Sequence, residues 1–117
     1  MLGPVDHVYY WTRDMERAVR FYTDVVGFSL ARRSGGDWAE LEAGGVRFAL
    51  HAAAGGGELP PSGTVVLRVD DLDAARTALA AHGVRLDGAA GEVEGVARFA
   101  TFHDPDANPV QIIEYAR

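Results

Sequence analysis

The fold of this chain is decided by the stretch Val5-Asp6-His7-Val8-Tyr9-Tyr10-Trp11-Thr12-Arg13-Asp14-Met15, whose pattern returns as Ser62-Gly63-Thr64-Val65-Val66-Leu67-Arg68-Val69-Asp70-Asp71-Leu72. Both stretches are apolar and rich in residues that favour strands, and both end at an aspartate that precedes a helical pattern. The carboxylate of such an aspartate can accept the unpaired N–H groups of a first helical turn. The sequence therefore predicts a strand followed by a helix in each half of the chain.

Each predicted helix carries one apolar stripe with three- and four-residue spacing and ends at a glycine, the usual left-handed helix terminator. The first stripe is Met15, Ala18, Val19, Tyr22 and Val26, before Gly27, and the second is Leu72, Ala75, Ala78 and Leu79, before Gly83.

Three strand-like stretches follow each helix, and residues that favour turns separate them. They are 28–32, 38–42 and 46–51 in the first half, and 84–86, 97–102 and 109–115 in the second. The sequence therefore predicts an α+β fold of two tandem βαβββ modules in a single domain, residues 1–117. Module one covers about 1–52, a linker rich in Ala, Gly and Pro covers about 53–62, and module two covers about 63–117.

Composition excludes several classes of chemistry. The chain has no cysteine, and its eleven basic residues are all arginine, so disulfides, thiolate nucleophiles and Schiff-base lysines are excluded. The net charge of −6 and the lack of a basic run argue against nucleic acid and anionic membrane surfaces as partners. The N-terminal residues have no signal-peptide pattern, so we expect a cytoplasmic protein.

A set of short motifs carries a resemblance to a known family. They are His7 followed by Asp14 and Ala18, Arg20-Phe21-Tyr22, Val26-Gly27-Phe28, Val69-Asp70-Asp71-Leu72, and Phe102-His103-Asp104-Pro105-Asp106-Ala107-Asn108-Pro109. With these motifs the chain resembles the vicinal oxygen chelate superfamily: glyoxalase I, bleomycin-resistance proteins, extradiol dioxygenases and fosfomycin-resistance transferases. The resemblance implies a curved mixed sheet that forms a cleft, with the helices on its outer face, and a homodimer.

In the metal-dependent members of that superfamily, the cleft presents metal ligands from the first and fourth strands of each module. The resemblance places these four positions at His7, Ala49, Thr64 and Gln111. Histidine is a competent ligand, glutamine is a weak one, and the alanine and threonine positions are losses, so the usual metal set is absent. A substitute site of His7, His51 and Gln111 would suit zinc, nickel or iron. The cofactor is therefore left open, as either none or one divalent transition metal ion.

Strand alternation places a group of aromatic and charged side chains on the cleft face. Tryptophan and tyrosine rings there could stack on a planar ligand, and glutamates beside them would favour a cationic guest. A second subunit could also bury the same rings. The expected ligand-binding residues are Tyr9, Trp11, Trp38, Glu40, Arg47, Phe99 and Gln111.

Two functions follow from these residues, and the sequence leaves open whether the protein is an enzyme. The first is a binding protein similar to the bleomycin-resistance proteins, which sequesters a planar or cationic small molecule without the usual metal set. The second is a glyoxalase- or dioxygenase-type metalloenzyme, a lyase, isomerase or oxygenase. In it His7 and His51 would be the catalytic residues, as metal ligands or as an acid–base pair, and Gln111 would be an oxygen ligand or an orienting residue.

Overall fold

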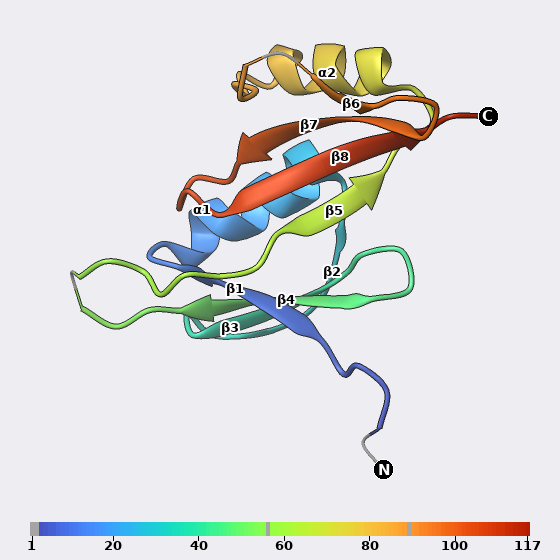
Figure 1. Ribbon diagram of the computed structural model, residues 1–117. Helices are drawn as coiled ribbons and strands as arrows, with labels where there is room; N and C mark the ends of the chain where they lie inside the picture. The colour runs from blue at the N-terminus through green and yellow to red at the C-terminus, as the bar shows by residue number, and fades with distance from the viewer. Residues whose placement is uncertain (1–2, 56, 89) are drawn as a thin grey trace. The chain divides into compact units, whose positions relative to one another are not determined.

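The computed structural model describes residues 3–55, 57–88 and 90–117, and the chain divides into two compact units, Met1–Ser62 and Gly63–Arg117. Both units have the same order of elements: one strand, a helical segment and three further strands (Figure 1). In both, the first strand pairs in parallel with the last, and the remaining pairs are antiparallel. The predicted α+β class and tandem βαβββ order are therefore confirmed.

The first unit contains a four-stranded mixed sheet in the order β1-β4-β3-β2. Its elements are β1 (Val8–Thr12), α1 (Met15–Arg20), the π-helix η1 (Phe21–Val26), β2 (Ser29–Ser34), β3 (Trp38–Glu42) and β4 (Arg47–Ala52).

The helical segment of the first unit begins and ends where the sequence predicts. The Asp14 side chain caps α1 by accepting the backbone N–H of Arg17 at 3.1 Å. Gly27 ends the segment with a φ of +93°, a left-handed conformation that favours glycine. The last six residues before that glycine are wound as a π-helix, which the apolar spacing does not distinguish from an α-helix.

The core of the first unit lies between this helical segment and one face of the sheet. Alternate residues of β4, Phe48 and Leu50, are buried there. The Phe48 ring packs against Tyr10, Tyr22 and Phe28, with ring centroids 4.7–5.5 Å apart. Because side chains alternate along a strand, Tyr9 and Trp11 lie on the opposite face of β1, and the ring of His7, directly before the strand, contacts Tyr9 there.

The second unit repeats the plan in the order β5-β8-β7-β6. The Asp71 side chain caps its helix by accepting the N–H of Ala74 at 3.0 Å, as predicted. That helix has ten residues, and no helix in the described parts of the chain is long and apolar enough to cross a membrane. The elements are β5 (Val65–Arg68), α2 (Leu72–Ala81), β6 (Gly91–Val93), β7 (Ala97–His103) and β8 (Pro109–Tyr115).

The turn between β7 and β8 is built around Asp104, a buried carboxylate. It accepts the backbone N–H groups of Asp106 and Asn108 at 2.9 and 2.8 Å, and the side-chain amide of Asn108 at 2.8 Å. These bonds account for the Asp-Pro-Asp motif as a turn, since a short carboxylate satisfies the backbone donors that the turn leaves unpaired.

The predicted strand 84–86 is wrong. Only Leu86 forms a bridge there, to Phe102, and the strand that follows α2 and pairs with the outer edge of β7 is β6. The N–H of Val84 is bonded to the carbonyl of Leu79, so the residue after Gly83 still belongs to the end of α2. In the stretch Val84-Arg85-Leu86, the first residue therefore completes the helix terminus and the last forms an isolated bridge, and the stretch does not form a strand.

Candidate functional site

The strand registers identify Ala49 and Gln111 as equivalent positions in the two units. Ala49 lies opposite Tyr9 in the parallel pair of β1 with β4, and Gln111 lies opposite Val66 in the parallel pair of β5 with β8. Both positions are therefore on the last strand of a unit, where the resemblance places metal ligands.

The donor chemistry at those positions does not fit a metal ion. Ala49 has no donor atom and is fully buried, and Gln111 donates its amide N–H to the Thr101 hydroxyl at 3.3 Å. Thr64, directly before β5, is exposed. Within residues 3–55, 57–88 and 90–117, no group of three or more His, Asp and Glu side chains could hold a metal ion.

One face of the sheet in the first unit carries a cluster of five rings, which we call the ring cluster. Trp11 and His51 are the closest pair, with centroids 4.3 Å apart. Trp38 contacts both imidazoles edge to face, at 5.4 Å from His7 and 5.5 Å from His51. The ring cluster consists of His7, Tyr9, Trp11, Trp38 and His51.

Ala49 is the small residue around which the ring cluster is arranged. It lies opposite Tyr9 on β1 and opposite Glu40 on β3, with His51 two residues further along its own strand. Strands are about 4.8 Å apart, so β1 and β3 are separated by about 9.6 Å across β4. The centroids of Tyr9 and Trp38 are nevertheless 6.3 Å apart, so these two side chains lean toward each other across Ala49.

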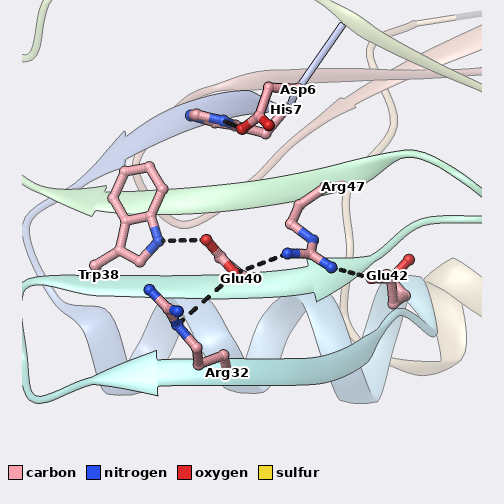
Figure 2. Close-up of polar contacts among 7 residues, drawn as sticks. All are labelled: Asp6, His7, Arg32, Trp38, Glu40, Glu42 and Arg47. Carbon is pink, nitrogen blue, oxygen red and sulfur yellow. Dashed lines mark hydrogen bonds and ion pairs between the residues drawn. The ribbon is translucent and has the colours of Figure 1, made fainter. Parts of the chain in front are cut away.

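A polar network borders the ring cluster on β2, β3 and β4 (Figure 2). The indole N–H of Trp38 donates to Oε1 of Glu40 at 3.2 Å, and Nη1 of Arg47 donates to Oε2 of the same carboxylate at 3.1 Å. Arg47 also donates through Nη2 to Glu42 at 3.1 Å, and Nε of Arg32 lies 3.9 Å from Oε2 of Glu40. The hydrogen bond to Glu42, with the charges of Glu40 and Glu42, raises the pKa of Arg47. Two carboxylates thus face two guanidinium groups.

Each imidazole in the ring cluster has one nitrogen engaged with an oxygen acceptor. Nδ1 of His7 lies 2.7 Å from a carboxylate oxygen of Asp6, and Nδ1 of His51 lies 3.0 Å from the carbonyl oxygen of Ala52. A carbonyl and an ionised carboxylate only accept, so Nδ1 carries the proton in both rings. In the neutral imidazoles Nε2 is then the nitrogen with the lone pair.

The second unit holds the remaining expected ligand residues, Phe99 and Gln111, on one face of its sheet. Phe99 lies opposite Gly91 on β6, and a Cβ atom built on that glycine would be 2.4 Å from Cζ of the ring. The phenyl ring therefore covers the glycine. On the same face, the guanidinium of Arg68 lies 4.9 Å from the centroid of the Tyr115 ring, within cation–π distance.

The structure thus brings seven of the expected residues to one sheet face of the first unit, and it adds two that sequence reasoning missed, Asp6 and Arg32, and a role for Ala49, which the resemblance gives only as a position without a ligand. Asp6 orients His7, Arg32 faces Glu40, and Ala49 supplies space rather than a ligand. The role of Asp6 could have been predicted, because it is adjacent to His7 in the sequence. The position of Arg32 beside Glu40 could not, because a bulge between Leu30 and Arg32 shifts the register of β2 against β3. The seven are His7, Tyr9, Trp11, Trp38, Glu40, Arg47 and His51.

Solved structures similar to this chain share its fold. One is a glyoxalase/bleomycin resistance protein/dioxygenase from Nocardioides, with 23% identity and a TM-score of 0.80 over 100% of this chain and 87% of that one. A lactoylglutathione lyase from Agrobacterium tumefaciens has 16% identity and a TM-score of 0.79 over 97% and 95%. TnmS3, an antibiotic binding protein from Streptomyces sp. CB03234, has 29% identity and a TM-score of 0.72 over 99% and 100%.

Sequence comparison assigns the family. No curated protein matches the chain closely enough to count as a relative. The pattern that defines the Glyoxalase/Bleomycin resistance protein/Dioxygenase superfamily, however, matches residues 5–112, nearly the whole length of the chain. Together with the two βαβββ units, this match shows that the chain belongs to the Glyoxalase/Bleomycin resistance protein/Dioxygenase superfamily.

Proposed function

We propose that this protein binds a planar aromatic small molecule against the ring cluster of its first unit. The observation that carries the proposal is the gathering of five rings on the sheet face opposite the helical segment, with Tyr9 43% exposed. Aromatic faces of this kind stack on planar ligands, and each contact contributes about 0.5–1.5 kcal/mol beyond area burial. The antibiotic binding protein from Streptomyces, 29% identical over 99% of this chain, supports a binding role.

The charges beside the ring cluster give a cationic ligand no advantage over another planar ligand. Free glutamates would attract a cation, but Glu40 and Glu42 both pair with Arg47, and Arg32 adds a second positive charge. An added cation would have to compete with guanidinium groups that already occupy the carboxylates. We therefore expect stacking area, and not positive charge, to determine which compounds bind.

The test uses two planar three-ring probes of opposite charge, proflavine and anthraquinone-2-sulfonate, titrated by isothermal calorimetry. Both should bind, and Trp11→Ala and Trp38→Ala should each weaken binding by about tenfold or more, which is about 1.4 kcal/mol. Leu30→Ala is the matched control, because Leu30 is 46% exposed on the other face of the sheet. Unchanged affinity in both tryptophan variants, or no binding of either probe, would reject the proposal.

A second copy of the chain is the competing occupant of this face, since superfamily resemblance implies a homodimer. Light scattering on the same variants separates the two. If Trp11→Ala and Trp38→Ala turn a dimer into a monomer while both probes still bind with parent affinity, the rings belong to a subunit interface. Loss of probe binding with an unchanged oligomeric state supports the ligand site.

A glyoxalase- or dioxygenase-type enzyme is the second candidate, and the two histidines favour it. Because Nδ1 of His7 and of His51 faces an acceptor, both neutral rings present Nε2 as the nitrogen that could bind a metal or take a proton. Elemental analysis of protein purified without chelator or affinity metal tests this candidate. One equivalent of a transition metal that is lost in His7→Ala and His51→Ala, but kept in His82→Ala, would favour the enzyme over the binding protein. His82 is an exposed control at the end of α2.

A further inference from the structure

We infer that Glu40 is a positioning residue of the binding site: it fixes the indole of Trp38 and does not itself contact the ligand. The inference rests on the proposed function, because Trp38 is one of the rings against which the ligand would stack. It changes the role that the sequence predicts for Glu40, which is to contact the ligand directly.

The first step is the bond that holds the indole. Trp38 and Glu40 are two residues apart on β3 and therefore project from the same face, where the indole N–H donates to Oε1 at 3.2 Å. Tryptophan has only this one polar atom, and a bond to a carboxylate is stronger than one to a neutral acceptor. The bond selects one orientation of the ring, which stands at 89° to the His7 ring and 88° to the His51 ring.

The second step is that both oxygens of Glu40 are already committed. Oε1 accepts from Trp38, and Oε2 accepts from Arg47 at 3.1 Å (Figure 2). The Glu40 side chain is only 15% exposed. With little of its surface exposed and both oxygens already bonded to side chains of the protein, the carboxylate has its main contacts within the protein and offers a ligand little area.

The third step is that Glu40 is itself held in place. Arg47 uses one Nη atom for Glu40 and the other for Glu42, so its planar guanidinium spans two carboxylates on β3. The residue directly opposite Glu40 is Ala49, whose methyl group leaves room for the arginine to approach diagonally. The series Trp38–Glu40–Arg47–Glu42 therefore connects the ring cluster to a cross-strand ion pair.

The test removes the carboxylate in two ways in a Trp11→Phe background, where Trp38 is the remaining tryptophan and the ring at position 11 is kept. Glu40→Ala removes the acceptor. Glu40→Gln keeps an oxygen acceptor for the indole but loses the charge. Glu94→Ala, in the turn between β6 and β7, is the matched glutamate control. Near-ultraviolet circular dichroism of the unliganded protein reports the Trp38 environment, and calorimetry with anthraquinone-2-sulfonate reports binding.

We expect Glu40→Ala to change the Trp38 dichroism and weaken the probe about tenfold, and Glu40→Gln to restore both, with affinity within about threefold of the parent. An unchanged dichroism in Glu40→Ala overturns the inference. So does a Glu40→Gln variant with restored dichroism but weak binding, since the carboxylate would then contact the ligand. If the parent binds no probe, the proposed function fails, while the dichroism still decides whether Glu40 positions the indole.

Discussion

Tyr9 and Trp38 lie on strands that are not neighbours, and yet their ring centroids are 6.3 Å apart, because both side chains lean across Ala49 on the strand between them. The alanine stands where metal-dependent members of the superfamily, by resemblance, carry a ligand. In this chain the position has a different physical role. A small side chain there allows aromatic rings from both flanking strands to meet over the middle of the sheet.

A larger side chain at this position should separate the rings. We expect Ala49→Leu to lower the free energy of unfolding by about 1–3 kcal/mol, since Ala49 is fully buried and extra methyl groups must displace neighbours. It should also weaken binding of both planar probes. Urea denaturation and calorimetry measure the two effects. Ala80→Leu on the exposed side of α2 is the control and should change stability by no more than about 0.5 kcal/mol. Equal effects of the two substitutions would contradict the role given to Ala49.

Much of the fold could be predicted from the sequence because its signals are local. Asp14 and Asp71 cap helices at the first turn, and Gly27 and Gly83 end them with positive φ, so both helices follow from short stretches of chain. The strands of the first unit follow from alternation and turn residues. The order β1-β4-β3-β2 comes from the structure, which repeats it as β5-β8-β7-β6 in the second unit.

The parts that could not be predicted depend on contacts between distant residues. The strand β6 is three residues long and is defined by its pairing with β7, and its own sequence, Gly91-Glu92-Val93, has almost no strand signal. The ion pairs of Glu40 also depend on such contacts. They require the strand register that places Arg47 diagonally across from Glu40, and the bulge that brings Arg32 beside it. The sequence spacing that predicts a cationic ligand therefore does not include the ion pairs that Glu40 and Glu42 form in the structure.

The ion pair between Glu16 and Arg33 should make stability depend on pH. Nη2 of Arg33 donates to the Glu16 carboxylate at 2.6 Å, and this hydrogen bond, with the arginine charge, lowers the pKa of Glu16. A carboxyl whose pKa is lower in the folded state stabilises that state above its ordinary pKa, and the contribution is lost as pH falls through the lowered value. We expect the parent to melt above Glu16→Gln near neutral pH and the difference to disappear in acid. Both groups lie at the surface, so about 1 M salt should also reduce it.

The control for this pair is Glu94→Gln, which changes the same charge in the turn between β6 and β7. Its melting temperature should follow that of the parent across the same pH range, because Glu94 tests only the loss of one surface charge. A Glu16→Gln difference that persists unchanged in acid would show that the carboxylate charge is not its cause.

The cap of α2 should contribute measurably to stability. Asp71→Ala removes the acceptor for the Ala74 N–H, and losing an N-cap of this kind costs about 1 kcal/mol. Urea denaturation measures the loss. Asp70→Ala, one residue earlier and exposed, removes the same charge without removing the cap. Equal losses in the two variants would mean that the charge near the helix N-terminus, and not the hydrogen bond, stabilises α2.

The contact between Phe99 and Gly91 predicts a change of sign in a double-mutant cycle. Because a Cβ atom at Gly91 would lie 2.4 Å from Cζ of the ring, Gly91→Ala must displace Phe99 and should cost about 1 kcal/mol. With the ring removed by Phe99→Ala, the same Gly91→Ala change should instead stabilise the protein by about 0.4–1 kcal/mol, since alanine restricts the unfolded chain.

Gly36→Ala is the control, because nothing lies within 4 Å of a Cβ at that glycine and its φ is not positive. Urea denaturation of the parent, the two single variants, the double variant and the control measures the cycle. If Gly91→Ala has the same effect with and without the ring, Phe99 does not cover the glycine.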